Sequence, residues 1–170
     1  MPENASNPVF LVDAESDPVV IRIDGRASFQ NSGCVRDFVS EMLRRGRTRF
    51  VIDFQNCASM DSTFLGVLAG AAIELRKPST NGSLVAARVG QRNMELLRSL
   101  GLHRLLTLDP GPAAPALGGC NTPLACEKKS EIDNARLVLE AHENLVNADE
   151  LNRAKFQDVL AFLRSRVEQK

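Results

Sequence analysis

The feature that most constrains the fold is the segment 50–77, in which a strand-like apolar run leads through a polar turn into a helix-like apolar run. The run at 49–54 is almost uninterrupted in apolar character, which suits a central strand buried on both faces. The turn ends in Asp61, Ser62 and Thr63, and a helix is expected from Ser62 to about Arg76. The segment therefore predicts a buried strand followed by a helix whose first residue carries a hydroxyl group.

A hydroxyl at the start of a helix has two interpretations. The first-turn amides lack intrahelical partners and add to the helix dipole, so they favour negative charge, and a phosphate on Ser62 would be held there. The alternative is an ordinary N-cap, in which the Ser62 hydroxyl accepts a hydrogen bond from a backbone amide. The spacing alone favours the N-cap, because the pattern is common at helix starts.

Strand and helix patterns alternate through the first two thirds of the chain. Short Val- and Ile-rich runs and amphipathic stretches give the order ββαβαβαβ. Strands are expected at 9–12, 19–24, 49–54, 82–89 and 104–108, and helices at 31–46, 62–76 and 92–100. Because each crossover must return over the sheet, this order predicts an α/β fold with a mixed sheet of about five strands and helices packed on it.

The last third of the chain has a different composition. The stretch 109–125 is rich in Pro and Gly, so it is interpreted as a linker with too little apolar surface to couple its neighbours tightly. Two helices are expected beyond it, one from Ser130 to about Val146 and one after Asn147. The expected division is a domain at 1–109, a linker at 110–129 and a C-terminal helical hairpin at 130–170.

The second of these helices carries an apolar stripe that needs a partner. Two alternatives remain open: the hairpin folds back on its own domain, or it is a docking or dimerisation arm that makes a homodimer. The stripe consists of Leu151, Phe156, Val159, Leu160, Leu163 and Val167.

Composition restricts the class of function. Charge is balanced, with Lys+Arg 21 and Asp+Glu 21, so no overall basic field favours direct contact with nucleic acid. The longest apolar stretch, 64–73, is about half of what a membrane-spanning helix needs, and 1–7 lacks the character of a secretory signal. We therefore expect a cytoplasmic protein without membrane insertion.

The cysteines and histidines show no pattern typical of a metal or catalytic site. Cys34, Cys57, Cys120 and Cys126 lack Cys-x-x-Cys spacing, so reduced thiols are expected, with a disulfide or metal role left open for Cys120 and Cys126. His103 is expected in a turn and His142 on the solvated face of a helix, in no catalytic dyad. No metal site and no cofactor are expected.

The sequence Asp61-Ser62-Thr63-Phe64-Leu65-Gly66 resembles the signature Asp-Ser-Ser/Thr-Gly-Leu-Gly of STAS domains, the family of bacterial anti-sigma factor antagonists and of sulfate-transporter tails. The resemblance extends from Val9 to Asp109 and includes the turn at 98–102. It implies a STAS-like sheet and a regulatory binding protein that is not an enzyme.

The resemblance also implies roles for individual residues. In the antagonists, the Ser after the motif's Asp is phosphorylated by a partner anti-sigma factor serine kinase, and by position this residue is Ser62. Asp61, Thr63, Phe64 and Ser28 would then belong to the partner-binding surface. A phosphate would add nearly two negative charges beside Asp61 and switch binding off.

Two positions depart from the family pattern. Phe64 stands where the signature has Gly, and its ring would either point into the core or give a partner an apolar anchor. Ser28 stands near the end of a loop where antagonists often carry Asp. The alternative function is therefore a STAS scaffold that is not phosphorylated, a subunit of a sensory or lipid-transport assembly.

Overall fold

The computed structural model describes residues 8–109 and 122–169. Its main feature is a six-stranded mixed sheet with the strand order β7-β6-β4-β2-β1-β8. The strands of this sheet are β1 (Phe10–Asp13), β2 (Val19–Ile23), β4 (Arg49–Asp53), β6 (Ser83–Ala87), β7 (Thr107–Asp109) and β8 (Thr122–Pro123). Two further strands, β3 (Gly25–Ala27) and β5 (Cys57–Met60), pair in parallel as a small separate sheet.

The central strand of the main sheet is β4, as its apolar run predicts. It pairs in parallel with β2 on one side and β6 on the other, and Phe50 and Ile52 are buried. Asp53 ends the strand with no exposed surface, and its carboxylate accepts two hydrogen bonds from the Arg88 guanidinium. These bonds raise the pKa of Arg88, so the buried carboxylate keeps a charged partner.

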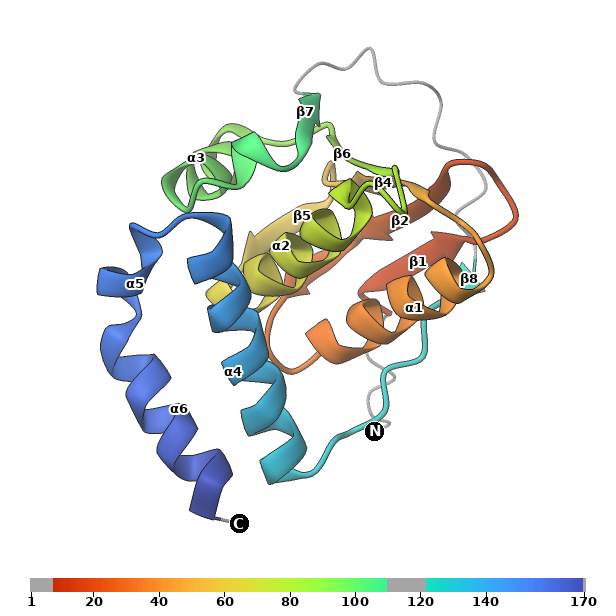
Figure 1. Cartoon of the computed structure of the whole chain (residues 1–170). Helices are drawn as coiled ribbons and strands as arrows, with labels where there is room; N and C mark the ends of the chain where they lie inside the picture. The colour runs from red at the N-terminus through yellow and green to blue at the C-terminus, as the bar shows by residue number, and fades with distance from the viewer. Residues whose placement is uncertain (1–7, 110–121, 170) are drawn as a thin grey trace.

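The helices α1 (Ser32–Arg44) and α2 (Ser62–Arg76) lie side by side over the sheet (Figure 1). α3 (Gln91–Ser99) and the short 3₁₀ turn η1 (Leu102–Arg104) connect β6 to β7. The C-terminal helices follow as α4 (Glu131–Ala148), α5 (Asn152–Lys155) and α6 (Gln157–Gln169). Figure 1 shows α4 next to α2, with α6 on the far side of α4.

The predicted α/β fold with a mixed STAS-like sheet and C-terminal helices is confirmed, and four details differ. The small sheet of β3 and β5 was not expected from the sequence. The sheet gains β8 at its edge, where Leu124 donates its amide to Phe10 and Pro123, which has no amide hydrogen to donate, is tolerated. Gly101, at φ 81°, ends α3 and starts η1, so β7 begins later than the expected strand. The second C-terminal helix is divided into α5 and α6.

The C-terminal extension folds back on the domain, which was one of the two alternatives for its apolar stripe. Leu137, Ala141 and Leu145 of α4 belong to the same hydrophobic core as the sheet, so the extension is not loosely coupled, contrary to the expectation from the linker. In α6, Leu160 and Leu163 are buried whereas Phe162 is exposed. The boundaries 1–109, 110–129 and 130–170 stay a prediction, since residues 1–7, 110–121 and 170 lie outside the described residues.

Candidate functional site

The start of α2 is formed by Asp61, which has extended backbone geometry and caps the helix. Its Oδ1 accepts a hydrogen bond from the Phe64 amide at 3.0 Å, and its Oδ2 accepts one from the Phe29 amide at 2.8 Å. Asp61, not Ser62, is therefore the N-cap, and the alternative that Ser62 is an ordinary cap is wrong. Ser62 is the first helical residue, and its hydroxyl is not used for capping.

The Ser62 hydroxyl instead contacts a side chain from the C-terminal extension. Ser62 is half-buried, and its Oγ lies 2.9 Å from Nε2 of His142 on α4. Nδ1 of His142 lies 2.7 Å from the carbonyl oxygen of Val138, a contact that requires a hydrogen on Nδ1. In the neutral imidazole, Nε2 therefore accepts the hydrogen bond that the Ser62 hydroxyl donates.

His142 corrects an expectation from the sequence. It is 3% exposed and packs edge-on against Phe156 with ring centroids 4.9 Å apart, so it does not lie on a solvated helix face. Spacing along the chain did not indicate the contact between Ser62 and His142, because the two residues meet although they are 80 positions apart. His103, by contrast, lies in the η1 turn, as expected.

The side chains of Thr63 and Phe64 point into the protein core and not toward solvent. Thr63 is 4% exposed, and Phe64 has no exposed surface and stacks on Phe10 of β1 with ring centroids 5.8 Å apart. The inward alternative for Phe64 is therefore observed, and its ring offers a partner no surface in this state. The Gly-to-Phe departure from the signature fills the core and leaves the Ser62 side of the helix free of an aromatic side chain.

Ser28 lies in the loop between β3 and α1, which is joined to the start of α2. Its hydroxyl accepts a hydrogen bond from the Gln30 amide, and its carbonyl accepts one from the Ser32 hydroxyl. The neighbouring residue Phe29 donates its amide to Asp61. The structure thus connects the Ser28 loop to the predicted site, although it gives Ser28 itself a local structural contact.

The surface of α2 next to Ser62 is covered by α4 at very close range. A Cβ atom added to Gly66 would lie 2.7 Å from the Cα of Ala141 and collide with its carbonyl group. One turn further, Gly70 faces the side chain of Asn144, which donates a hydrogen bond to the Gly66 carbonyl at 3.3 Å. We call Ser62, Gly66 and Gly70 the outer face of α2.

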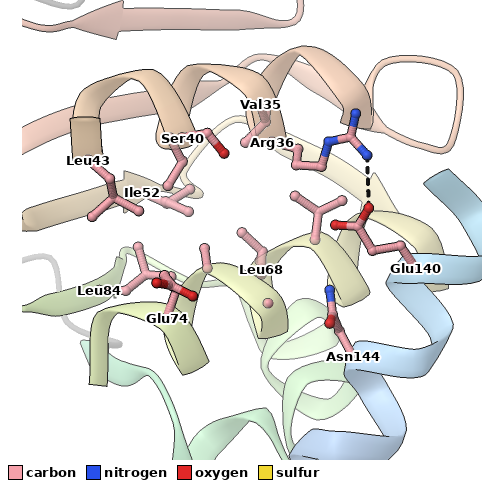
Figure 2. A pocket seen from close by; sticks show the side chains of 14 residues that line it. Val35, Arg36, Ser40, Leu43, Ile52, Leu68, Glu74, Leu84, Glu140 and Asn144 are labelled. Carbon is pink, nitrogen blue, oxygen red and sulfur yellow. Dashed lines mark hydrogen bonds and ion pairs between the residues drawn. The ribbon is translucent and has the colours of Figure 1, made fainter. Parts of the chain in front are cut away.

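A groove of about 370 Å³ runs between α1 and α2 and ends against α4 (Figure 2). Val35, Val39 and Leu68 are among its apolar walls. Arg36 of α1 reaches across the end of the groove to Glu140 of α4 at 3.0 Å, and Asn144 lies beside it. α4 is therefore held to α1 as well as to the outer face of α2.

The cysteines differ from the sequence-based expectation. Cys34 on α1 and Cys126, in the segment before α4, form a disulfide with a Cα–Cα distance of 5.0 Å, so they are not reduced thiols in this structure. Spacing could not reveal this pair, because 92 positions separate its members. Cys57 is a free thiol, and burial raises its pKa to about 11. Cys120 lies outside the described residues.

Two further observations concern membranes and metals. Among the helices of the described ranges, none combines the length and the apolar character that crossing a bilayer requires. Within the same ranges, His, Cys, Asp and Glu side chains do not gather in a group of three that could hold a metal ion.

Residues 10–107 match the family model described as Mlab, STAS domain. A putative anti-sigma factor antagonist from Thermotoga maritima shares the fold with a TM-score of 0.52 and 17% identity, covering 61% of this chain and 88% of its own. No curated protein gives a significant match.

Two structures of SpoIIAA are also similar. The Bacillus cell fate determinant SpoIIAA in its phosphorylated form is 21% identical, with a TM-score of 0.49 over 58% of this chain and 89% of its own. The anti-sigma factor antagonist SpoIIAA in its unphosphorylated form is 21% identical, with a TM-score of 0.47 over 52% and 81%. The family match spans more than half of the chain and includes β1 through the start of β7, and on this basis the chain belongs to the STAS domain family.

Proposed function

We propose that this protein is a regulatory binding module of the anti-sigma factor antagonist type, controlled by phosphorylation of Ser62 by a partner serine kinase. The observation that carries the proposal is that Asp61 and Ser62 have different roles at the start of α2. Asp61 caps the helix, so the Ser62 hydroxyl is left at the first helical position without a capping role. Such a kinase uses ATP, and we place the protein in the cytoplasm for that reason.

The chemistry of the site supports a switch. A phosphate on Ser62 would lie at the positive end of a 15-residue helix, which stabilises the modified form. The same phosphate would stand next to the Asp61 carboxylate and bring nearly two negative charges to a surface that now carries a neutral hydroxyl. A partner that fits the unmodified surface would therefore bind the phosphorylated chain more weakly.

The contact between Ser62 and His142 does not make the protein an enzyme in this proposal. A substrate would have to displace α4 to reach the Ser62 hydroxyl, and the imidazole would leave with the same helix. Nucleophile and base would thus separate when access opens, whereas covalent catalysis needs them within hydrogen-bond reach during reaction. The STAS fold is, moreover, typically a regulatory domain without enzymatic activity.

The alternative function is a STAS scaffold subunit of a sensory or lipid-transport assembly that is not phosphorylated. One observation favours it, namely that Ser62 is half-buried and its hydroxyl already has a partner in His142. In this alternative, Ser62 holds α4 in place permanently. A homodimer through the C-terminal helices stays a proposal, with Leu151 and Phe162 as its exposed apolar residues.

The test has two arms. Mass spectrometry of the chain from its own cells should find a phosphate on Ser62 that the Ser62→Ala variant lacks. Calorimetry with the anti-sigma-type kinase encoded nearest to its gene should show weaker binding for Ser62→Asp than for the unmodified chain. Ser79→Asp, which adds the same charge beyond the other end of α2 at an exposed position, is the matched control. Equal affinity of the unmodified chain, Ser62→Asp and Ser79→Asp for the kinase would favour the scaffold function.

A further inference from the structure

Helix α4 covers the residue that the proposed function needs to be accessible. It lies next to α2 (Figure 1) and packs across the outer face at Gly66. Its His142 accepts the hydrogen bond that the Ser62 hydroxyl donates. We propose that α4 is an autoinhibitory helix, and that the Cys34–Cys126 disulfide is the latch that keeps it closed. This inference rests on the proposed function, because it states how access to Ser62 is regulated.

The contacts of α4 leave no room for a kinase or a phosphate. The Ser62 Oγ and His142 Nε2 atoms are 2.9 Å apart, a distance at which no phosphoryl group fits between them. Asn144 donates a hydrogen bond to the Gly66 carbonyl one turn further along α2, and the Ala141 backbone lies against Gly66. A phosphorylated Ser62 and a docked α4 therefore exclude each other.

Most polar contacts that hold α4 over this surface are weak, because they are exposed to water or have a long donor–acceptor distance. Arg36 and Glu140 form an ion pair at the end of the groove (Figure 2), with 32% and 53% of their side chains exposed, so water screens it. The Asn144 bond, at 3.3 Å, is long. The Ser62–His142 bond is shorter, at 2.9 Å, and its imidazole is buried, so removing this bond leaves α4 held mainly by apolar packing.

The two ends of α4 are held in different ways. At its C-terminal end, the side-chain amide of the fully buried Asn152 donates to the carbonyls of Leu100 and Leu145, at 2.9 and 2.7 Å. At its N-terminal end, Cys126 precedes the helix by a few residues and is bonded to Cys34. The attachment at Asn152 is noncovalent and does not depend on redox state, whereas the disulfide opens on reduction. α4 can then swing out about its Asn152 end.

Reduction of the latch is a balanced thiol–disulfide exchange. A dithiol reductant transfers two electrons and two protons, the Cys34–Cys126 bond breaks to give two thiols, and the reductant becomes a disulfide. Intracellular disulfides are usually transient and redox-sensing, which fits a latch better than a permanent brace. While the latch is closed, the apparent affinity of any partner for the outer face is reduced in proportion to the small fraction of open molecules.

Hydrogen exchange of the full chain tests the proposal without any kinase. Amides of α4 are followed by mass spectrometry, with β4 as the internal reference for global unfolding. Reduction should speed exchange of α4 by about tenfold or more, because the constraint on its opening is lost. His142→Ala should speed it about fivefold through the lost hydrogen bond. In both cases α4 should exchange well before β4, and β4, whose exchange follows global stability, should stay the slower of the two.

Two matched controls accompany this experiment. Asn147→Ala changes an exposed position of α4, and Cys57→Ser removes the free thiol, so neither should alter α4 exchange. If α4 exchanges only together with β4 after reduction, it is a permanent part of the core and the proposal is overturned. Should His142→Ala unfold the chain, the comparison of oxidised and reduced wild type still decides. A missing phosphate on Ser62 would refute the proposed function but would leave α4 exchange unaffected.

Discussion

The two faces of α2 are built from different kinds of residue. Its inner face presents Phe64, Leu68 and Leu75, all fully buried and large, and Phe64 stacks on the sheet. Its outer face presents Ser62, Gly66 and Gly70 to α4. Large apolar side chains gain most free energy on burial, whereas small residues let two helix backbones approach closely with little side-chain burial.

This difference separates the stability of the whole fold from the attachment of a single helix. The inner face fixes α2 on the sheet through apolar area, so changes there should act on the whole fold. The outer face holds α4 through close backbone approach and hydrogen bonds, together with the apolar packing of Leu137, Ala141 and Leu145, so changes there should act first on α4. Mutations of equal size on the two faces are therefore predicted to have unequal consequences.

The largest effect is expected from Phe64→Ala on the inner face. Truncating this fully buried ring leaves a cavity against Phe10 and should lower the free energy of unfolding by about 3–5 kcal/mol. Urea denaturation measures the loss. Phe162→Ala, at a ring that is 69% exposed, is the control and should change stability by less than about 0.5 kcal/mol. Similar losses in both variants would contradict the inward packing of Phe64 described above.

Opening the disulfide should have the next largest effect. The bond joins residues 92 positions apart, so Cys34→Ser under oxidising conditions should lower the free energy of unfolding by about 2–4 kcal/mol. The matched variant is Cys57→Ser, which leaves the bond intact. Urea midpoints of the two variants are compared with and without reductant, and the Cys34→Ser midpoint should no longer respond to it. A response as large as that of the wild type would contradict the assigned pair.

A smaller effect is expected from a single methyl group on the outer face. Gly66→Ala favours the helical conformation of α2 but collides with the Ala141 backbone, so we expect a net loss of about 1–3 kcal/mol. Gly70→Ala meets only the movable end of the Asn144 side chain and should cost less than about 1 kcal/mol. Thermal denaturation of both variants measures the difference. Equal costs would show that α4 does not lie on Gly66 as described.

The smallest effect on stability, and the sharpest contrast, concerns thiol reactivity. Burial raises the pKa of Cys57 from 9.0 to about 11, so at pH 8 its thiolate is about a hundredfold scarcer than that of an ordinary cysteine. After reduction, Cys34 and Cys126 should react with iodoacetamide well before Cys57, as peptide mapping would show. Because the raised pKa favours the folded state below about pH 9, that contribution should fade as pH rises through about 11.

The fold was largely predictable from local patterns, and the site only in part. The apolar run before Asp61 and the helix from Ser62 to Arg76 follow from residues close in sequence, and the structure gives the helix these same ends. The cap was misassigned because Asp and Ser are both good N-caps and only geometry chooses between them.

The contact between His142 and Ser62 could not be predicted from spacing, since it joins positions 80 apart. One signal was available for its burial. Val138 and Val146 lie four residues before and after His142, so the histidine falls within an apolar stripe of α4 and not on its solvated face. The Cys34–Cys126 pair had no such local signal, because it depends on how the segment before α4 crosses α1.

The most direct test of the two-face account uses α4 itself as a peptide. Ala141→Glu places a charge against Gly66 and should undock α4 while leaving the outer face of α2 unchanged. A labelled peptide of residues 128–149 is titrated with this full-length variant and followed by fluorescence anisotropy, with circular dichroism as the check on folding. We expect the peptide to bind the variant but not the oxidised wild type, and a peptide carrying Ala141→Glu to bind neither. A folded variant that fails to bind the wild-type peptide would contradict the account.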